Sequence, residues 1–306
     1  MRRLITAALI LCLLLCGCTA APEDTATNKL SIVCANYPAY DLARSVAGDR
    51  AELTLLIKPG AELHGYEPTP KDMIRIQNSD LFICNGGESE EWTEELTDGD
   101  MNIVRMMDVV ETVEEEVKDG MQSHEEEGEE EELDEHVWTS PVNAKRISEA
   151  ICRELCEISP NNAEEYNTRL EAYSAQLMEL DTEFRNIVEN ARSKTLVFAD
   201  RFPMRYFTKE YGLEYYAAFP GCASETEPSA KTVAFLIDKV REEDLSAVLY
   251  MEFSNQKMAD VICEDTGCEK LPFYSVHNIT AAQFEAGESY LSLMRQNLIT
   301  LKEALS

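Results

Sequence analysis

The sequence predicts an α/β fold with two similar lobes, each built on a parallel sheet, joined by one long rigid helix. Short apolar runs of strand length alternate with segments whose apolar residues recur at helical spacing, and both halves of the chain repeat this alternation. Between the halves, residues 159–192 carry apolar side chains at steps of mostly three and four, with no Gly or Pro after Pro160. We therefore expect a helix roughly 45 Å long between an N-terminal lobe, residues 29–158, and a C-terminal lobe, residues 193–306.

The elements of the first lobe each have a local signal. Apolar runs predict buried strands at residues 30–35, 53–57 and 81–84. Pro38 opens a helix that ends at Gly48. Thr69-Pro70 and Ser140-Pro141 each place a capping hydroxyl before a proline that suits the first helical position, so two further helices are expected there.

The second lobe repeats the pattern after the connecting helix. Strands are predicted at residues 196–199, 215–219, 247–251 and 271–274, and helices at 204–211, 230–240, 255–266 and 284–304. A coiled coil is the alternative for residues 159–192, but only about four heptads are present and strand–helix units flank them on both sides. A single helix packed along both lobes is therefore the preferred interpretation.

Residues 1–17 are expected to be a lipoprotein signal peptide. Arg2 and Arg3 precede an apolar run at residues 4–15, which is shorter than the roughly 20 residues of a membrane-spanning helix. The run ends in Leu15-Cys16-Gly17-Cys18, which resembles a bacterial lipobox with Cys18 as the lipidated residue; a plain signal peptide cleaved nearby is the alternative. Residues 18–28 then form a polar tether. We expect an extracytoplasmic protein, attached to the cell membrane through its N-terminal lipid only.

The charge balance limits the classes of ligand that the protein can bind. The chain has 58 Asp plus Glu against 27 Lys plus Arg, a formal net charge of -31. Binding to nucleic acid requires a cationic surface that meets phosphates, so this composition argues against it. The same charge is compatible with cationic ligands.

Much of that charge lies in residues 111–135, which hold fourteen carboxylates and one Lys. Like charges so close repel one another and little in the segment is apolar, so it is predicted to be a solvated loop. His124 stands inside it. Two interpretations are open: a solubilising insert, or a labile site that captures cations near the main site.

Cysteine usage gives little guidance to function. Ten Cys are present, and seven follow the lipobox: Cys34, Cys84, Cys152, Cys156, Cys222, Cys263 and Cys268. The chain has no CxxC pair, so a structural zinc ribbon is unsupported. Cys263 and Cys268 are spaced so that a disulfide can join them.

Three histidines occupy positions typical of a ligand site. His64 follows a predicted strand and precedes a helix start, His136 lies between the acidic segment and a helix start, and His277 follows the last strand. In open parallel sheets, ligands bind at the edge where the strands end. Because these residues come from both halves, we expect them to meet in a cleft between the lobes. Neutral imidazole is a common ligand of zinc, so the cleft is predicted to hold a metal.

Several motifs keep a recognisable order and spacing. They are Pro59-Gly60 and His64 through Tyr66-Glu67-Pro68-Thr69-Pro70, Asp80-Leu81-Phe82-Ile83 with Gly86-Gly87 and Glu91-Trp92, the acidic insert before His136-Val137-Trp138, Tyr206-Phe207 with Tyr211-Gly212-Leu213, and Glu225 through Pro228-Ser229. Over about residues 30–304 the chain thereby resembles the solute-binding lipoproteins of zinc and manganese ABC transporters, the metal-binding adhesin-like group. That family has two α/β lobes joined by one long helix, as predicted above.

The resemblance implies a metal site made of four side chains. His64 and His136 match the first two ligands of the family. Arg201 stands where the third is usual, and a guanidinium cannot ligate a cation. His277 stands where the fourth, usually Asp, is expected. The site therefore departs from the family pattern at two of its four positions.

A substitute third ligand is left open. Glu225 is the preferred candidate and Cys222 the alternative. In the other interpretation, Arg201 pairs with Glu225 or Glu227 and the metal keeps three histidines and a solvent molecule. Three imidazoles favour Zn²⁺ over Mn²⁺, which suits more oxygen ligands.

The resemblance implies a monomeric binding protein, not an enzyme. It would capture a divalent transition metal and deliver it to an ABC permease, whose ATPase is a further separate chain. A metal-dependent hydrolase is one alternative, but the chain has no HExxH motif. A surface adhesin without a transport role is the other.

Overall fold

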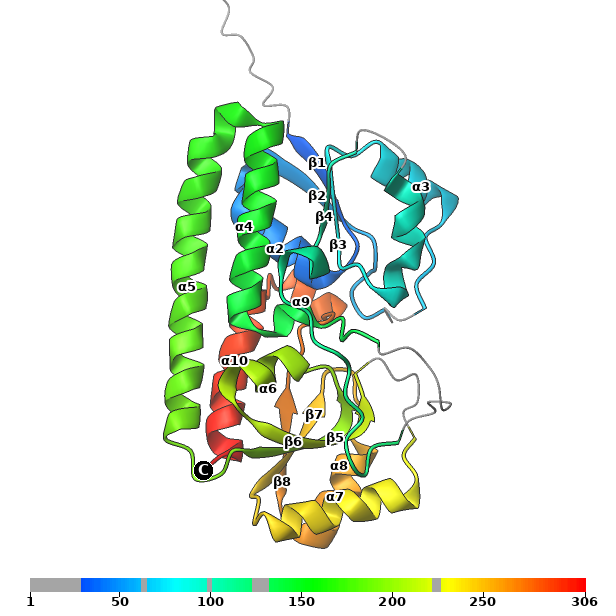
Figure 1. Ribbon diagram of the computed structural model, residues 1–306, viewed down its shortest axis with the longest axis vertical. Helices are drawn as coiled ribbons and strands as arrows, with labels where there is room; N and C mark the ends of the chain where they lie inside the picture. Colours follow the sequence, from blue (N-terminus) through cyan, green and yellow to red (C-terminus); the bar gives the residue numbers. More distant parts are fainter. Residues whose placement is uncertain (1–28, 62–64, 98–100, 123–131, 222–226) are drawn as a thin grey trace, which may run out of the picture.

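The computed structural model describes residues 29–61, 65–97, 101–122, 132–221 and 227–306. Two α/β lobes are stacked along the long axis of the molecule, and one long helix runs beside both of them (Figure 1). Each lobe contains a sheet of four parallel strands. The predicted fold class is confirmed.

The N-terminal sheet has the strand order β2-β1-β3-β4. Its strands are β1 (Leu30–Cys34), β2 (Ala51–Leu55), β3 (Leu81–Cys84) and β4 (Ile103–Arg105). Helices α2 (Tyr37–Ala47) and α4 (Pro141–Ile158) cover one face and α3 (Pro70–Gln77) lies on the other. The edge strand β4 was not predicted, because three residues are too few to show a periodicity. A 3-10 segment at Glu88–Thr97 was also missed.

The C-terminal sheet has the equivalent order β6-β5-β7-β8. Its strands are β5 (Thr195–Phe202), β6 (Glu214–Pro220), β7 (Ala247–Met251) and β8 (Glu269–Phe273), and its helices are α6 (Arg205–Tyr211), α7 (Ala230–Glu242), α8 (Lys257–Thr266), α9 (Ala281–Glu285) and α10 (Tyr290–Ala304). The prediction of one final helix over 284–304 is wrong. Gly287, at φ +76°, separates α9 from α10, and the hydroxyl of Ser289 caps α10.

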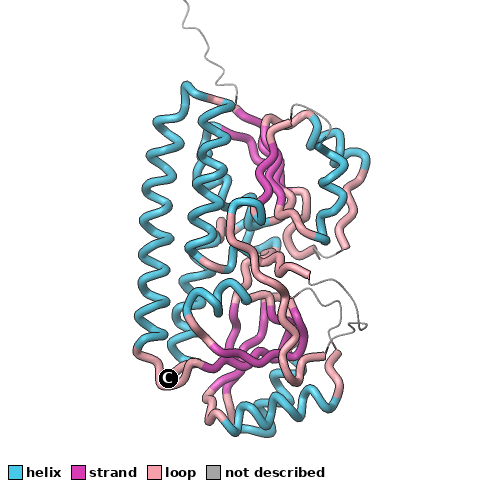
Figure 2. The backbone as a smooth tube through the Cα atoms, in the orientation of Figure 1, coloured by secondary structure: helices cyan, strands magenta, loops and turns pink. Residues whose placement is uncertain are grey.

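Helix α5 (Ala163–Glu189) is the long connecting helix, and a 3-10 turn at Pro160–Asn162 precedes it. Its 27 residues correspond to about 40 Å at 1.5 Å per residue. It packs against α2 and α4 of the first lobe and α10 of the second (Figure 2). The apolar side chains on this side of both sheets belong to one continuous cluster, so the lobes share a core. Such a shared core opposes hinge opening between the lobes.

The acidic segment is not simply a solvated loop. Among its described residues, Glu114 and Leu133 form an antiparallel bridge, and the Asp134 N–H donates to the Val113 carbonyl at 2.9 Å. The described residues of 111–135 therefore lie in loops and turns whose two arms pair with each other. His124 lies outside the described residues.

Residues 111–122, which we call the strap, cross from the first lobe to the second. The carboxylate of Glu116 pairs with Arg205 at 2.8 Å and accepts the Tyr215 hydroxyl at 2.9 Å. The Gln122 N–H donates to the carbonyl of Ala218 in edge strand β6, at 2.8 Å. The strap carboxylates thus have partners in the second lobe. The local charge of the sequence gives no indication of these contacts.

No helix within the described ranges is long and apolar enough to cross a bilayer. Cys263 and Cys268 are both free thiols, with their Sγ atoms 3.1 Å apart. A disulfide between them therefore stays a prediction.

Candidate metal centre

The structure brings two of the predicted ligands together. His136 precedes the 3-10 turn Val137–Thr139 in the first lobe, and His277 follows β8 in the second. Their ring centroids are 5.2 Å apart and the ring planes are nearly perpendicular, at 87°. The other predicted residues lie outside the described ranges: His64, His124, Cys222, Glu225 and Cys18. Within those ranges, no group of three His, Cys, Asp or Glu side chains is placed to hold an ion.

Asp134 orients the ring of His136. One carboxylate oxygen of Asp134, Oδ1, accepts the backbone N–H of His136 at 2.8 Å and lies 3.2 Å from its Nδ1. This contact favours the tautomer with the proton on Nδ1, which leaves the lone pair of Nε2 for a metal. Burial of the ring lowers its pKa, but nearby carboxylates outweigh that effect and raise the pKa of His136, Asp134 most strongly. The ring therefore sits in a field that favours a bound cation.

Both lobes hold the backbone of this loop. The hydroxyl of Tyr206, on α6, donates to the Asp134 carbonyl at 2.7 Å. The side-chain amide of Asn85 donates to the Glu135 carbonyl at 2.9 Å, and the carboxylate of Glu135 accepts the N–H of Ser89 at 2.8 Å. These bonds fix the position of His136, which is 1% exposed.

His277 lies in a constrained loop. Glu252, directly after β7, accepts the backbone N–H of His277 at 3.2 Å, and it also binds the N–H and hydroxyl of Ser275 at 2.8 and 2.6 Å. Burial raises the pKa of Glu252, although these hydrogen bonds act in the opposite direction. Val276 has φ +61°, which is rare for a β-branched residue and indicates strain held by the surrounding structure.

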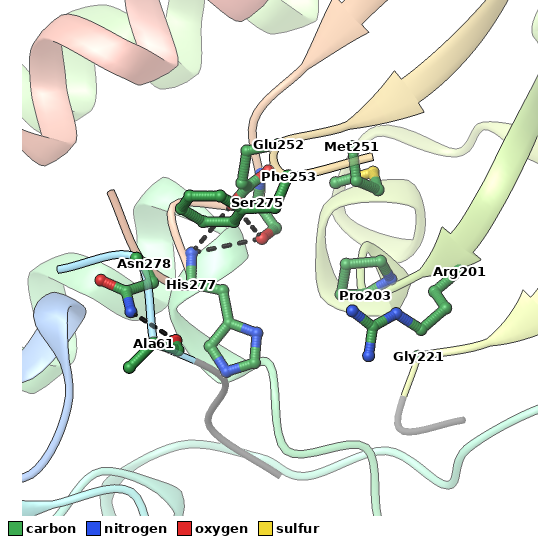
Figure 3. A pocket seen from close by; sticks show the side chains of 11 residues that line it. Ala61, Arg201, Pro203, Gly221, Met251, Glu252, Phe253, Ser275, His277 and Asn278 are labelled. Carbon is green, nitrogen blue, oxygen red and sulfur yellow. Dashed lines mark hydrogen bonds between the residues drawn. The ribbon is translucent and has the colours of Figure 1, made fainter. Parts of the chain in front are cut away.

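A cavity of about 190 Å³ lies beside His277. Gly60 and Ala61 of the first lobe form one wall, and residues of the second lobe form the rest, among them Arg201 and Gly221 (Figure 3). Arg201 comes from β5, just after the register shift that follows Phe198. Its guanidinium is thus at the cavity, and it cannot itself ligate a cation.

Gly221 lies against the ring of His136. A Cβ at this position would lie 3.1 Å from Cε1 of His136 and 3.0 Å from the Phe202 carbonyl oxygen. The same point is 3.3 Å from Oε1 of Glu115, whose charge also helps to raise the pKa of His136. The strap therefore brings a carboxylate to this site.

Asp134 and Glu115 were not predicted as site residues. Asp134 had a usable signal, because a carboxylate two residues before a candidate histidine is well placed to contact it. Glu115 had none, since it is one of fourteen carboxylates in residues 111–135.

Two α/β lobes that share one long helix, with an imidazole from each lobe meeting beside an interlobe cavity that His277 lines, define a solute-binding protein. The chain belongs to the family described as zinc-uptake complex component A, periplasmic, whose model matches residues 32–304. The resemblance expected from the sequence is thereby confirmed.

Relatives and solved structures agree with this membership. The chain is 32% identical over 286 residues to the zinc-binding lipoprotein AdcA of Streptococcus pneumoniae, covering 92% of this chain but only 57% of that protein. It is 30% identical over 315 residues to the high-affinity zinc uptake system protein ZnuA of Bacillus subtilis, covering 98% of this chain and 96% of that one. The Zn(II)-bound ZnuA-like domain of Streptococcus pneumoniae AdcA matches at a TM-score of 0.75 and 28% identity, over 90% of this chain and 99% of that domain.

Proposed function

We propose that this protein captures zinc outside the cytoplasm and delivers it to an ABC permease, whose ATPase is a separate chain. The observation that carries the proposal is the approach of His136 and His277 from opposite lobes, with ring centroids 5.2 Å apart, where His277 lines a cavity between the lobes. Relatives described as zinc-binding and zinc-uptake proteins support zinc as the cargo. The class is that of a binding protein, not an enzyme.

The proposed ligands are His64, His136 and His277, with Glu225 in place of the third ligand of the family. Three imidazoles favour Zn²⁺, and Mn²⁺ is the alternative cargo. Cys222 is the alternative to Glu225. If Glu225 instead pairs with Arg201, a solvent molecule completes the tetrahedral set that zinc prefers.

Release requires only small movements in this proposal. The shared core along α5 opposes a wide hinge motion, so the loops that carry the ligands would move instead. The constrained backbone at Val276 is one place where such a loop can change its conformation.

For location, we propose that Cys18 is lipidated and holds a monomeric body at the extracytoplasmic face of the cell membrane. The lipobox-like Leu15-Cys16-Gly17-Cys18 supports this, as does the description of the AdcA relative as a lipoprotein. Mass analysis of the N-terminal peptide from membranes would detect the lipid, and an unmodified peptide would contradict the proposal.

Elemental analysis of the purified protein tests the metal site. We expect one zinc per chain, and loss of it in H64A, H136A and H277A, with a smaller loss in E225A. H124A is the matched control, because it removes the remaining histidine and should keep the zinc. Retention of zinc by H136A or H277A, or tighter binding of Mn²⁺ than Zn²⁺ in competition, would contradict the proposal.

A further inference from the structure

The side chain of Asn278 crosses between the lobes next to His277. Its Nδ2 donates to two carbonyls of the first lobe, that of Ala61 at 2.8 Å and that of Lys58 at 3.1 Å (Figure 3 shows the first). Its Oδ1 accepts the N–H of Ile279 at 2.8 Å. Asn278 is 6% exposed, so these bonds form away from bulk solvent.

The two accepting carbonyls are the ends of one rigid turn. The N–H of Ala61 donates back to the Lys58 carbonyl at 3.0 Å, and Gly60 between them has φ +80°. Pro59 followed by Gly60 at the two central positions is the pattern of a type II turn. Asn278 therefore holds residues 58–61 as a unit, directly before the segment that contains His64.

Among side chains of this length, only an amide has both the donors and the acceptor that these three hydrogen bonds need. Two carbonyl acceptors need two N–H groups, and the N–H of Ile279 needs an acceptor on the same side chain. Turning the amide over would place its oxygen against both carbonyls, so the hydrogen bonds fix its orientation.

The opposite side of the His277 loop is held within the second lobe. Glu252 binds the N–H of His277, as described above. The loop is thus held by Glu252 from its own lobe and is joined through Asn278 to the turn at 58–61 of the other. Any separation of the two lobes at this cavity must break the bonds of Asn278.

We propose that Asn278 is a positioning residue that couples the His277 loop to the 58–61 turn, and so slows the loss of bound metal. The inference rests on the proposed function for its metal, but the coupling itself is a property of the protein without metal. Asn278 ligates nothing in this proposal. Its effect is on the rate of release, since both loops must separate before the cargo leaves.

The test compares Asn278→Leu, which keeps the approximate shape and removes both donors, with Asn278→Ser, which can keep one. Asn190→Leu is the control, because among the described residues the Asn190 amide donates to the Asn186 carbonyl alone, at the exposed end of α5. Zinc release is followed after mixing with excess chelator. We expect about tenfold faster release for N278L, a smaller increase for N278S and none for N190L.

Hydrogen exchange in the metal-free protein provides the second measurement. Peptides covering residues 55–61 should exchange faster in N278L and N278S than in the wild type, and N190L should match the wild type. Wild-type exchange in both Asn278 variants would overturn the coupling, and faster exchange with unchanged zinc release would overturn its effect on retention. If the wild type binds no zinc, the proposed function fails, and exchange alone decides whether Asn278 joins the loops.

Discussion

The indole Nε1 of Trp138 donates a hydrogen bond to the carbonyl of Ser275 at 2.9 Å. This bond joins the loop of His136 to the loop of His277, because Trp138 follows the first and Ser275 precedes the second. The Trp138 ring also contacts both imidazoles, with centroid distances of 5.6 Å to His136 and 5.5 Å to His277. One buried side chain thus sets the spacing of the two proposed ligands.

Trp138→Phe should weaken zinc binding. The substitution keeps an aromatic ring but leaves the Ser275 carbonyl without its donor, which costs about 1–3 kcal/mol of folding free energy in a buried setting. Because the two imidazoles lose the contact that sets their spacing, we expect the Kd for zinc to rise roughly tenfold. Chelator competition measures the Kd. The control is Trp92→Phe, which changes the other Trp, packed against Tyr66 and Phe82 in the first lobe. Equal Kd values for the two variants would contradict the role of Trp138.

Gly221→Ala should also reduce zinc affinity, through steric pressure on His136. The new methyl would lie 3.1 Å from the His136 ring and 3.0 Å from a backbone carbonyl, so the ring must shift. We expect about a tenfold loss of affinity, which is 1.4 kcal/mol. Gly65→Ala is the control, since its Cβ meets nothing within 4 Å among the residues that the structure describes. An unchanged affinity in G221A would show that the ring position does not matter for binding.

Elements with a local signal could be predicted from sequence. The hydroxyls of Thr69 and Ser140 do cap α3 and α4, and a proline follows each of them. The buried face of α5 could be predicted because its 27 residues form several helical turns, so the spacing of its apolar side chains repeats many times. The meeting of His136 and His277 followed from a general rule of parallel sheets, not from any pattern specific to those residues.

The strap and the interlobe bonds could not be predicted in this way. Glu116 contacts Arg205 and Tyr215, which lie 89 and 99 residues further along the chain, and Asn278 binds a turn more than two hundred residues before it. Such pairs depend on how the two lobes face each other, and no local pattern in the sequence indicates that arrangement. A charge run therefore predicts solvation even where some of its carboxylates, such as Glu116, have tertiary partners.

Deleting residues 123–131 should slow metal capture without changing the proposed tight site. The deletion removes His124 and six glutamates but keeps the strap and Asp134. We expect a lower association rate for Zn²⁺ at low ionic strength and little difference at high salt, because salt screens attraction over about 10 Å. A Gly/Ser segment of the same length is the control for chain connectivity. Equal association rates at low salt would favour the solubilising insert.

Glu90 should make the stability of the first lobe depend on pH. Its Oε2 accepts the N–H groups of Asn85 and Gly86 at 2.6 and 2.9 Å, while its Oε1 is buried with no hydrogen-bond partner among the described residues. Burial raises the pKa of Glu90 from 4.5 to about 7. The folded state therefore holds this proton more tightly than the unfolded state. The free energy of unfolding consequently falls as pH rises from 4.5 to about 7, by about 3 kcal/mol in total for this group.

Glu90→Gln should remove this fall in the free energy of unfolding with rising pH, because the amide oxygen can accept hydrogen bonds from the same two N–H groups without a charge. In urea unfolding, we expect E90Q to exceed the wild type by up to about 3 kcal/mol at pH 8 and by less than about 1 kcal/mol at pH 5. Glu91→Gln, at an exposed neighbouring position, is the control for the general effect of removing a negative charge. A gain of the same size at both pH values would show that the effect does not come from the proton on Glu90, because only a titrating group makes the difference between the two proteins depend on pH.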